Sequence, residues 1–229
     1  MSHSAARRRV LVFDVNETLL DIEVLHPFFA RRFGEARVIR QWFAELILYS
    51  EALTLSGGYT DFGSLSVAVL RMIGVIRHVE LTQDDIDEFI ATIRALPPHR
   101  EVPGALERLA NAGFRMVTLT NSAGDAGKAA LDQAGLSRYF EKSFSVEEVR
   151  QYKPAREVYM HVSRALNTEP QHLRLIAAHT WDTLGAMTAG YAGALVTRPG
   201  NAPLSIGPQP DIVAPDLDEV ASRIIATDR

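Results

Sequence analysis

The sequence lacks several features that would each define a class of protein. Its 229 residues include no cysteine, which excludes disulfides, thiolate metal sites and cysteine nucleophiles and is typical of a cytoplasmic location. No apolar run approaches the roughly 18 residues of a membrane-spanning helix. A basic stripe is also absent, because the net charge is -4 and the longest basic run is Arg7-Arg8-Arg9. We therefore expect no membrane and no nucleic-acid partner.

Residues 1–9 are predicted to form a disordered N-terminus that ends in this basic run. The apolar segment behind it, Val10–Phe13, is too short for the hydrophobic region of a signal peptide, because Asp14 ends it. What the chain does contain is an ordinary globular balance, with 47% hydrophobic and 23% charged residues. Its length suits one large domain, or a core with a smaller inserted unit.

Short apolar strand patterns recur along the chain and alternate with helical patterns. The strand candidates are Val10–Phe13, Arg115–Thr120, Leu173–Ala178 and Gly193–Thr197. Helices are predicted to begin near Asp125 and Trp181. This alternation predicts an α/β fold with a Rossmann-like three-layer core, in which helices cover both faces of a parallel sheet. The segment Arg198–Pro215 holds five prolines and little periodicity, so we predict an irregular surface loop there.

Residues 22–96 interrupt that alternation with successive helical patterns. We predict helices at Val38–Leu55 and Phe62–Ile76, and a third that Thr82 opens with a capping-box signal. An all-helical cap is therefore expected at residues 22–96, inserted into a core made of residues 10–21 and 97–229. Within the cap, Trp42–Tyr49 is apolar on more than one helical face. This string either fills the core of the cap or also pairs two subunits in a homodimer.

Polar residues suited to catalysis fall in four short groups, each at the expected end of a strand or in a loop. Taken singly, such residues often cap helices, form turns or face solvent. The carboxyl ends of parallel strands meet at one edge of a sheet, where open α/β folds bind their ligands. We therefore expect the four groups to converge. They are Asp14 with Asn16 and Thr18, Thr120 with Asn121 and Ser122, Lys153, and His179 with Asp182.

In this order and spacing the groups resemble the haloacid dehalogenase superfamily, from Val10 to about Pro215. That superfamily has a nucleophilic Asp after the first strand, a Ser or Thr after the second, then a Lys, and one or two acids after the fourth. The residues at those positions here are Asp14, Thr120, Lys153 and Asp182. Further motifs resemble the type II (L-2-haloacid) dehalogenases: Arg40-Gln41, Tyr152-Lys153-Pro154 with Tyr159, and Ala178-His179-Thr180-Trp181-Asp182 with Gly185-Ala186.

The resemblance implies hydrolysis of a short 2-haloalkanoic acid to a 2-hydroxy acid and a halide ion. The reaction would pass through an ester on Asp14, without a metal or other cofactor, and Arg40 matches the halide-binding arginine of that subfamily. The residue types suit this chemistry, since a carboxylate is already ionised at neutral pH and needs no base to act as a nucleophile. Lys153 is expected to hold Asp14 beside an anionic substrate, and Asp182 to support it.

Asn16 decides between two enzymatic functions. Phosphatases of the superfamily carry a second Asp at this position, which protonates the leaving alcohol, and an amide cannot do so. A halide needs no proton to leave, so Asn16 favours dehalogenation. The alternative is a Mg²⁺-dependent phosphatase acting on a small phosphometabolite. A third alternative is a catalytically idle homologue that binds a small anion or a partner, against which the retained Asp14 and Lys153 argue.

Several other residues stay open between two roles. Thr18, Thr120 and Asn121 can donate hydrogen bonds to Asp14 or to the substrate carboxylate. His179 stands where the type II motif has Asn, and it either orders or deprotonates the hydrolytic water or packs at the strand end. Three aromatic residues either line the substrate pocket or belong to the core: Phe62, Tyr159 and Trp181.

Overall fold

The computed structural model describes residues 8–228. Within them the strands form a six-stranded sheet, every neighbouring pair is parallel, and the order is β3-β2-β1-β4-β5-β6. Their bounds are β1 Val10–Phe13, β2 Met116–Thr120, β3 Lys142–Ser145, β4 Leu173–Ala177, β5 Ala192–Val196 and β6 Ile212–Ala214. The first strand lies at the centre, where Val12 pairs with Val117 of β2 and Leu175 of β4. The predicted α/β fold with a parallel sheet is confirmed.

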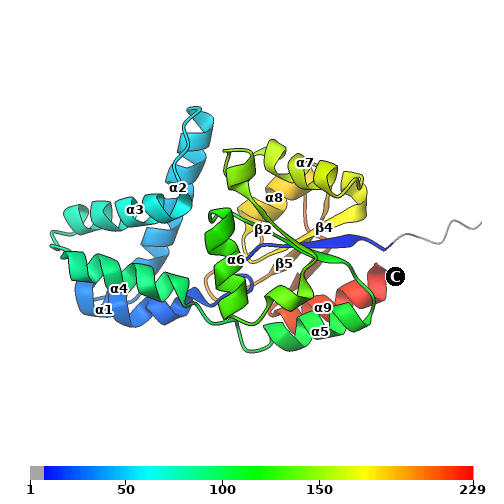
Figure 1. Cartoon of the computed structure of the whole chain (residues 1–229), viewed down its shortest axis with the longest axis horizontal. Helices are drawn as coiled ribbons and strands as arrows, with labels where there is room; N and C mark the ends of the chain where they lie inside the picture. Colours follow the sequence, from blue (N-terminus) through cyan, green and yellow to red (C-terminus); the bar gives the residue numbers. More distant parts are fainter. Residues whose placement is uncertain (1–7, 229) are drawn as a thin grey trace, which may run out of the picture.

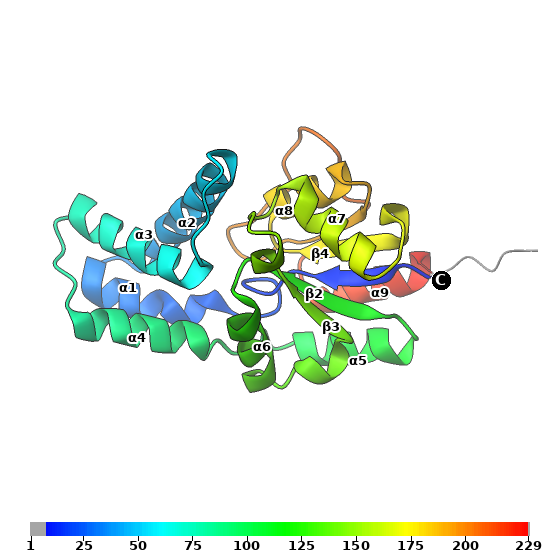
Figure 2. The ribbon, with the colours of Figure 1, turned by 45° about the horizontal axis from the view of Figure 1, so that its top comes forward.

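Helices cover both faces of this sheet, which explains why β1 is an unbroken apolar run instead of an alternating one. Helices α5 and α9 pack against each other on one face, and α7 and α8 lie together on the other (Figures 1 and 2). The sheet is therefore the middle of three layers. The helix bounds are α5 Val102–Asn111, α6 Gly124–Gln133, α7 Arg156–Ala165, α8 Thr180–Thr188 and α9 Leu217–Thr227.

The insertion between β1 and α5 is helical, and we call its helices α1–α4 the cap helices. Figure 1 shows them beyond one end of the sheet. Helices α2 and α3 have the predicted bounds, and Thr82 caps α4 through reciprocal bonds with Asp85. The domain boundaries themselves stay a prediction. After a 3₁₀ turn at Ile22–Leu25, the bounds are α1 His26–Phe33, α2 Val38–Leu55, α3 Phe62–Ile76 and α4 Gln83–Arg94.

An aromatic cluster forms the core of the cap helices. The Trp42 ring lies 5.2 Å from Phe89 and 5.9 Å from Phe29, centroid to centroid, and its indole N–H donates to the Ser66 carbonyl oxygen at 3.0 Å. The interpretation of this string as cap core is therefore correct for Trp42. Further along α2, Leu48 and Tyr49 are exposed at 54% and 40%. That exposed face is what the homodimer hypothesis rests on.

Two predictions near the chain ends need correction. The predicted loop Arg198–Pro215 contains strand β6, which is only three residues long and therefore too short to show an alternating pattern. Most of the predicted disordered N-terminus, residues 1–7, lies outside the described residues. Arg8 and Arg9 are held by the core, because Arg8 donates to the Ala112 carbonyl oxygen and Arg9 pairs with Asp228. Between residues 8 and 228, we find no helix with the length and apolar character needed to cross a membrane.

Candidate active site

Asp14 follows the central strand directly, so its carboxylate lies at the carboxyl end of the sheet. The residue is 5% exposed. The fully buried Lys153 places its ammonium 2.8 Å from Asp14 Oδ1 and 3.1 Å from the Leu119 carbonyl oxygen. The sequence prediction that these two side chains converge is therefore correct in geometry, although they lie 139 positions apart in the chain.

A second carboxylate meets Lys153 from the other side. Asp182, in the first turn of α8, accepts from the ammonium at 2.6 Å and from the Tyr159 hydroxyl at 2.7 Å. Gly185 permits this close approach, because a Cβ there would lie 2.5 Å from Pro154 Cβ and 2.8 Å from the Tyr159 hydroxyl oxygen. Tyr159, predicted to line a pocket or belong to the core, is fully buried, binds Asp182 and is not among the residues that line the cavity described below.

Three further residues predicted at the site surround this charge cluster. The Thr18 hydroxyl donates to Asp14 Oδ2 at 2.5 Å and accepts from the Ala178 amide at 2.8 Å, which joins the ends of β1 and β4. Asn121 Oδ1 accepts from the Lys153 amide at 3.2 Å. The Thr120 hydroxyl accepts from the Ser122 amide at 3.1 Å. Thr18 therefore contacts Asp14 directly, whereas Asn121 and Thr120 shape the loops around it.

His179 lies edge-on to Asp14, with Nδ1 at 3.5 Å from Asp14 Oδ2. Its ring is 4% exposed and stacks between Phe43 and Trp181, at centroid distances of 5.1 Å and 5.0 Å. The Trp181 ring thus packs against one face of the His179 ring, and it also lies 5.8 Å from the Lys153 ammonium. His179 is thus packed just after the end of β4, as one of the two predictions has it, and its ring also lies beside Asp14.

Glu17 is a site residue that the sequence did not indicate. Its side chain is buried, with Oε2 at 2.8 Å from His179 Nε2 and Oε1 paired with Arg40 Nη1. The Arg40 guanidinium also donates to the Pro199 carbonyl oxygen at 2.8 Å. Arg40 is therefore connected to Asp14 only through Glu17 and His179, and it does not line the cavity described below.

The pKa directions suit a nucleophilic carboxylate. Burial raises the pKa of Asp14, but Lys153 and His179 lower it more, so it lies well below its usual range. For Lys153, burial lowers the pKa, and the charges of Asp14 and Asp182 raise it above normal. Burial and the nearby Asp14 raise the pKa of Asp182 despite Lys153. Asp14 is consequently ionised and Lys153 charged at neutral pH.

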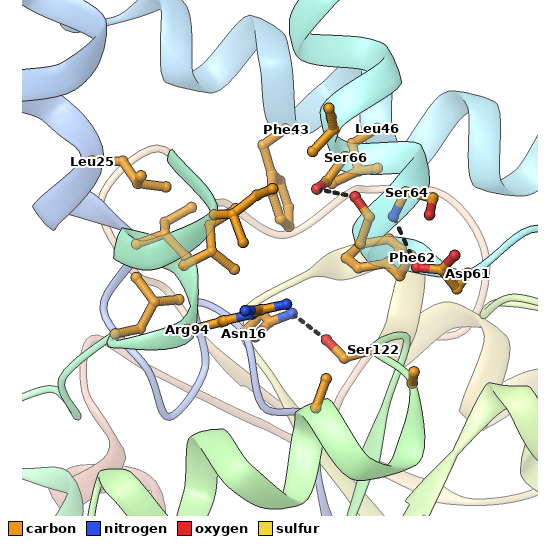
Figure 3. Close-up of a pocket in the computed structure, with 18 of the residues that line it drawn as sticks. Asn16, Leu25, Phe43, Leu46, Asp61, Phe62, Ser64, Ser66, Arg94 and Ser122 are labelled. Atoms are coloured by element: carbon orange, nitrogen blue, oxygen red, sulfur yellow. Dashed lines mark hydrogen bonds between the residues drawn. The ribbon is translucent and has the colours of Figure 1, made fainter. Parts of the chain in front are cut away.

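A cavity of about 510 Å³ lies between this cluster and the cap helices (Figure 3). Asp14 is not in its lining, but Asn16, two residues on, is, and so is Phe43, which stacks on His179. The predicted pocket residue Phe62 lines it as well. Its apolar lining comes from Leu25 of the 3₁₀ turn and from residues of the cap helices, Trp42, Leu46, Val67, Ile90 and Ile93. Asp61, Ser64 and Ser66 are polar members of the same lining.

Three polar side chains stand on the core side of the cavity in Figure 3: Asn16, Ser122 and Arg94. The Asn16 amide donates to the Ser122 hydroxyl oxygen at 3.2 Å. Arg94, in the last turn of α4, was missed by sequence reasoning because a basic residue at a helix end is ordinary. Asn16 therefore lines the cavity, and its contact with a ligand stays a prediction.

The donor set does not fit Mg²⁺. The Lys153 ammonium already occupies the position between Asp14 and Asp182 where a cation would balance both carboxylates. Asn16 directs its amide to Ser122, and in the part of the chain from residue 8 to 228 no three acidic or imidazole side chains converge as metal ligands. The Lys153 ammonium thus supplies the positive charge between the carboxylates of Asp14 and Asp182.

A family profile for haloacid dehalogenase-like hydrolases matches residues 8–177. The chain belongs to this family. Among curated relatives, (S)-2-haloacid dehalogenase 2 of Pseudomonas sp. strain CBS-3 is 26% identical over 214 residues, which cover 93% of each chain. (S)-2-haloacid dehalogenase 4A of Burkholderia cepacia is 26% identical and covers 85% of each. Both spans include the core and the cap helices.

The fold likeness extends to solved structures. L-2-haloacid dehalogenase from Xanthobacter autotrophicus, determined with chloropropionic acid covalently bound, superposes with a TM-score of 0.86 at 23% identity. The superposition covers 97% of this chain and 100% of that one. At this identity the comparison establishes that this hydrolase has the same fold as that enzyme.

Proposed function

We propose that this hydrolase removes the halogen from a 2-haloalkanoic acid through an ester on Asp14. The observation that carries the proposal is the Asp14–Lys153–Asp182 cluster with an amide, Asn16, in place of a general acid. The (S)-2-haloacid dehalogenases among its relatives and the covalent chloropropionic acid complex of the Xanthobacter enzyme support it. The product is the corresponding 2-hydroxy acid.

In the first half-reaction, an Asp14 oxygen attacks C2 of the substrate and the carbon–halogen bond breaks. The halogen leaves with the bonding electron pair as a halide ion. Lys153, bound to Asp14 Oδ1 at 2.8 Å, keeps the carboxylate ionised and aligned near an anionic substrate. In the second half-reaction, water attacks Asp14 Cγ and the bond between Cγ and the substrate oxygen breaks. This step restores the carboxylate.

Substrate recognition falls to the cavity. Arg94 is the cation of its lining and stands with Asn16 and Ser122 at the core side, where a substrate carboxylate would lie. The halide-binding role predicted for Arg40 requires its guanidinium to leave Glu17, because neither Arg40 nor Glu17 lines the cavity. We retain that role only for a conformation in which the cap helices have shifted.

The proposal includes catalysis without a metal. Lys153 takes the charge-balancing place, and a halide leaves without a proton, so neither Mg²⁺ nor an acid at position 16 is needed. A phosphatase would need both. The absence of an acid at Asn16 is thus the feature that ranks dehalogenation above phosphate ester hydrolysis.

Halide release from chloro-, bromo- and fluoroacetate and from 2-chloropropionate, with and without EDTA, tests the proposal. We expect release that EDTA does not change and that Asp14→Asn abolishes. A panel of phosphate esters with Mg²⁺ runs in parallel, for the wild type and for Asn16→Asp. Phosphate release by the wild type that EDTA stops, with no halide from any haloacid, would overturn the proposal in favour of the phosphatase.

We also propose that the protein is a cytoplasmic homodimer. The exposed apolar residues Leu48, Tyr49 and Leu55 on α2 support pairing of two copies, and the cysteine-free sequence suits a reducing compartment. Sedimentation at micromolar concentration is expected to give twice the chain mass. A single monomeric mass would contradict the dimer, and Leu48→Glu with Leu55→Glu is expected to produce it.

A further inference from the structure

A chain of contacts behind Asp14 is not used by the chemistry described so far. It runs from Arg40 to Glu17, from Glu17 to His179, and from His179 to Asp14. Glu17 and His179 are both buried, at 2% and 4% exposure. Burying a carboxylate costs free energy unless the carboxylate is paired, and here Arg40 and His179 pair with Glu17. A buried group held in this way is a candidate for a role in the fold or in the reaction.

The backbone at Glu17 has a conformation that residues other than glycine rarely adopt. Its φ is +65°, in the left-handed region that glycine adopts freely and a residue with a Cβ adopts at a cost of about 1 kcal/mol or more. The Glu17 amide donates to the Leu20 carbonyl oxygen at 2.9 Å, which closes the turn. A glycine would form this turn more easily, so the side chain of Glu17 is what distinguishes the position.

The side chain of Glu17 fixes the orientation of His179. A carboxylate only accepts, so the 2.8 Å contact places a proton on His179 Nε2 and directs Nδ1 to Asp14. Phe43 and Trp181 hold the ring plane between them. His179 Nδ1 is buried and makes no hydrogen bond within residues 8–228. A buried nitrogen left open beside the reacting carboxylate is placed to meet a water molecule there.

We propose that His179 transfers protons during hydrolysis of the Asp14 ester, and that Glu17 is the positioning residue that aims it. This inference rests on the proposed function, because it concerns the second half-reaction. Water attacks Asp14 Cγ and gives one proton to His179 Nδ1. When the bond from Cγ to the substrate oxygen breaks, His179 passes that proton to the departing oxygen, which becomes the hydroxyl of the product.

The remaining proton of the water molecule accounts for the resting state. It stays on the Asp14 carboxyl group after the ester breaks and then moves to His179, which leaves an imidazolium beside a carboxylate. Before the next hydrolysis, that imidazolium releases one proton to solvent. The sum is one haloacid and one water converted to one hydroxy acid, one halide ion and one proton.

The charges around His179 support this sequence. Burial lowers its pKa, but Asp14 and Glu17 more than offset this and raise it to about 9 in the resting enzyme. Farther out, Lys153 binds Asp14 and Arg40 binds Glu17. Ester formation removes the charge of Asp14 and leaves Glu17 as the facing carboxylate. His179 therefore becomes easier to deprotonate in the intermediate, when a base is needed.

Rapid-quench kinetics with 2-chloropropionate would test the proposal, with halide release and the mass of the Asp14 peptide as readouts. We expect His179→Ala to release about one halide per site and then to hydrolyse the ester about 100-fold more slowly. Glu17→Gln keeps an acceptor for Nε2 but loses the charge. Its ester hydrolysis is expected to slow about tenfold, with the half-maximal rate at lower pH than in the wild type.

Glu23→Gln is the matched control. Glu23 also contacts Arg40, with Oε1 at 3.6 Å, and its carboxylate is half-exposed and away from His179. This variant is expected to keep the wild-type rate and pH profile. Glu17→Gly provides a second test that does not depend on tolerating Gln, because glycine suits the positive φ at this position.

The outcomes separate the two proposals. If Glu17→Gln and Glu17→Gly hydrolyse the ester within twofold of the wild-type rate and with its pH profile, Glu17 does not position His179 and the inference fails. Rapid ester hydrolysis by His179→Ala would likewise contradict it. If the wild type releases no halide from any 2-haloacid, the proposed function itself fails, whatever the variants do.

Discussion

The core side of the site carries three carboxylates in contact with three cations, whereas the cap side is an apolar cavity of about 510 Å³. Except for Arg40, which comes from cap helix α2, the residues of the core side lie in the segments that follow the strands of the sheet. Those of the cap side lie on helices that pack mainly on one another. Under the proposed function, this difference predicts that the core side performs the chemistry and the cap side selects the substrate.

Loss of Lys153 should have the largest effect on the core side. Lys153→Met leaves Asp14 and Asp182 buried without their shared cation, so we expect turnover to fall at least about 1000-fold. The free energy of unfolding should fall by about 3–5 kcal/mol. Halide release and urea unfolding would measure both. Lys142→Met, at an exposed position on β3, is the control; equal effects of the two variants would contradict the account.

The pH dependence of stability should also come from the core side. The folded pKa of His179, about 9, lies above its usual value of 6.5. Its stabilising contribution is therefore complete below about pH 6.5 and is lost as the pH rises to about 9, by roughly 3 kcal/mol. Urea unfolding of the wild type should show this decline. His179→Asn should flatten it, and an unchanged slope in that variant would sink the prediction.

The cap side should determine how kcat/KM depends on the length of the substrate tail. A two- or three-carbon acid fills little of a cavity lined by Leu46, Val67 and Ile90. Each methylene added to the tail should raise kcat/KM about fourfold until the cavity is full. The series 2-bromopropionate, 2-bromohexanoate and 2-bromooctanoate would measure this trend. Val67→Phe should remove the increase in kcat/KM for long tails. A wild type that prefers bromopropionate would contradict the assignment of substrate selection to the cap side.

Arg94 should give the smallest effect, because it is exposed and solvent screens its charge. Arg94→Gln is expected to raise KM for 2-haloacids about tenfold with kcat nearly unchanged, since binding is lost equally from ground and transition states. Arg71→Gln on α3, which contacts Gln83, serves as the control. A fall in kcat without a change in KM would assign Arg94 to the chemistry instead.

The same division explains what the sequence could predict. Strand patterns at β1, β2, β4 and β5 were visible because both faces of the sheet are covered, so that their residues are buried almost throughout and mostly apolar. The edge strands escaped notice. In β3, Lys142 and Ser143 are exposed, and β6 has three residues. Helices α2 and α3 were found with correct bounds because they are long and strongly apolar.

For the site, sequence reasoning located residues in the segments that follow strands and missed those defined by tertiary contacts. Asp14 directly follows β1, Lys153 lies in the loop between β3 and α7, and Asp182 lies in the first turn of α8. The three side chains meet as expected. Glu17 could not be recognised, because nothing local shows that its acid group turns inward. Its positive φ, which a glycine would satisfy, is the only signal, and it requires the structure. Arg40 was assigned a halide-binding role by resemblance, whereas in the structure its guanidinium pairs with Glu17.

The central claim is that Asp14 becomes covalently bound to the substrate carbon. A single turnover in water labelled with heavy oxygen, with enzyme in excess over 2-chloropropionate, tests this most directly. We expect the label to enter the Asp14 carboxylate, measured on the peptide that contains it, and the hydroxy acid to carry none. Label in the product hydroxyl after one turnover, with Asp14 unlabelled, would show that water displaces the halide directly and would contradict the account.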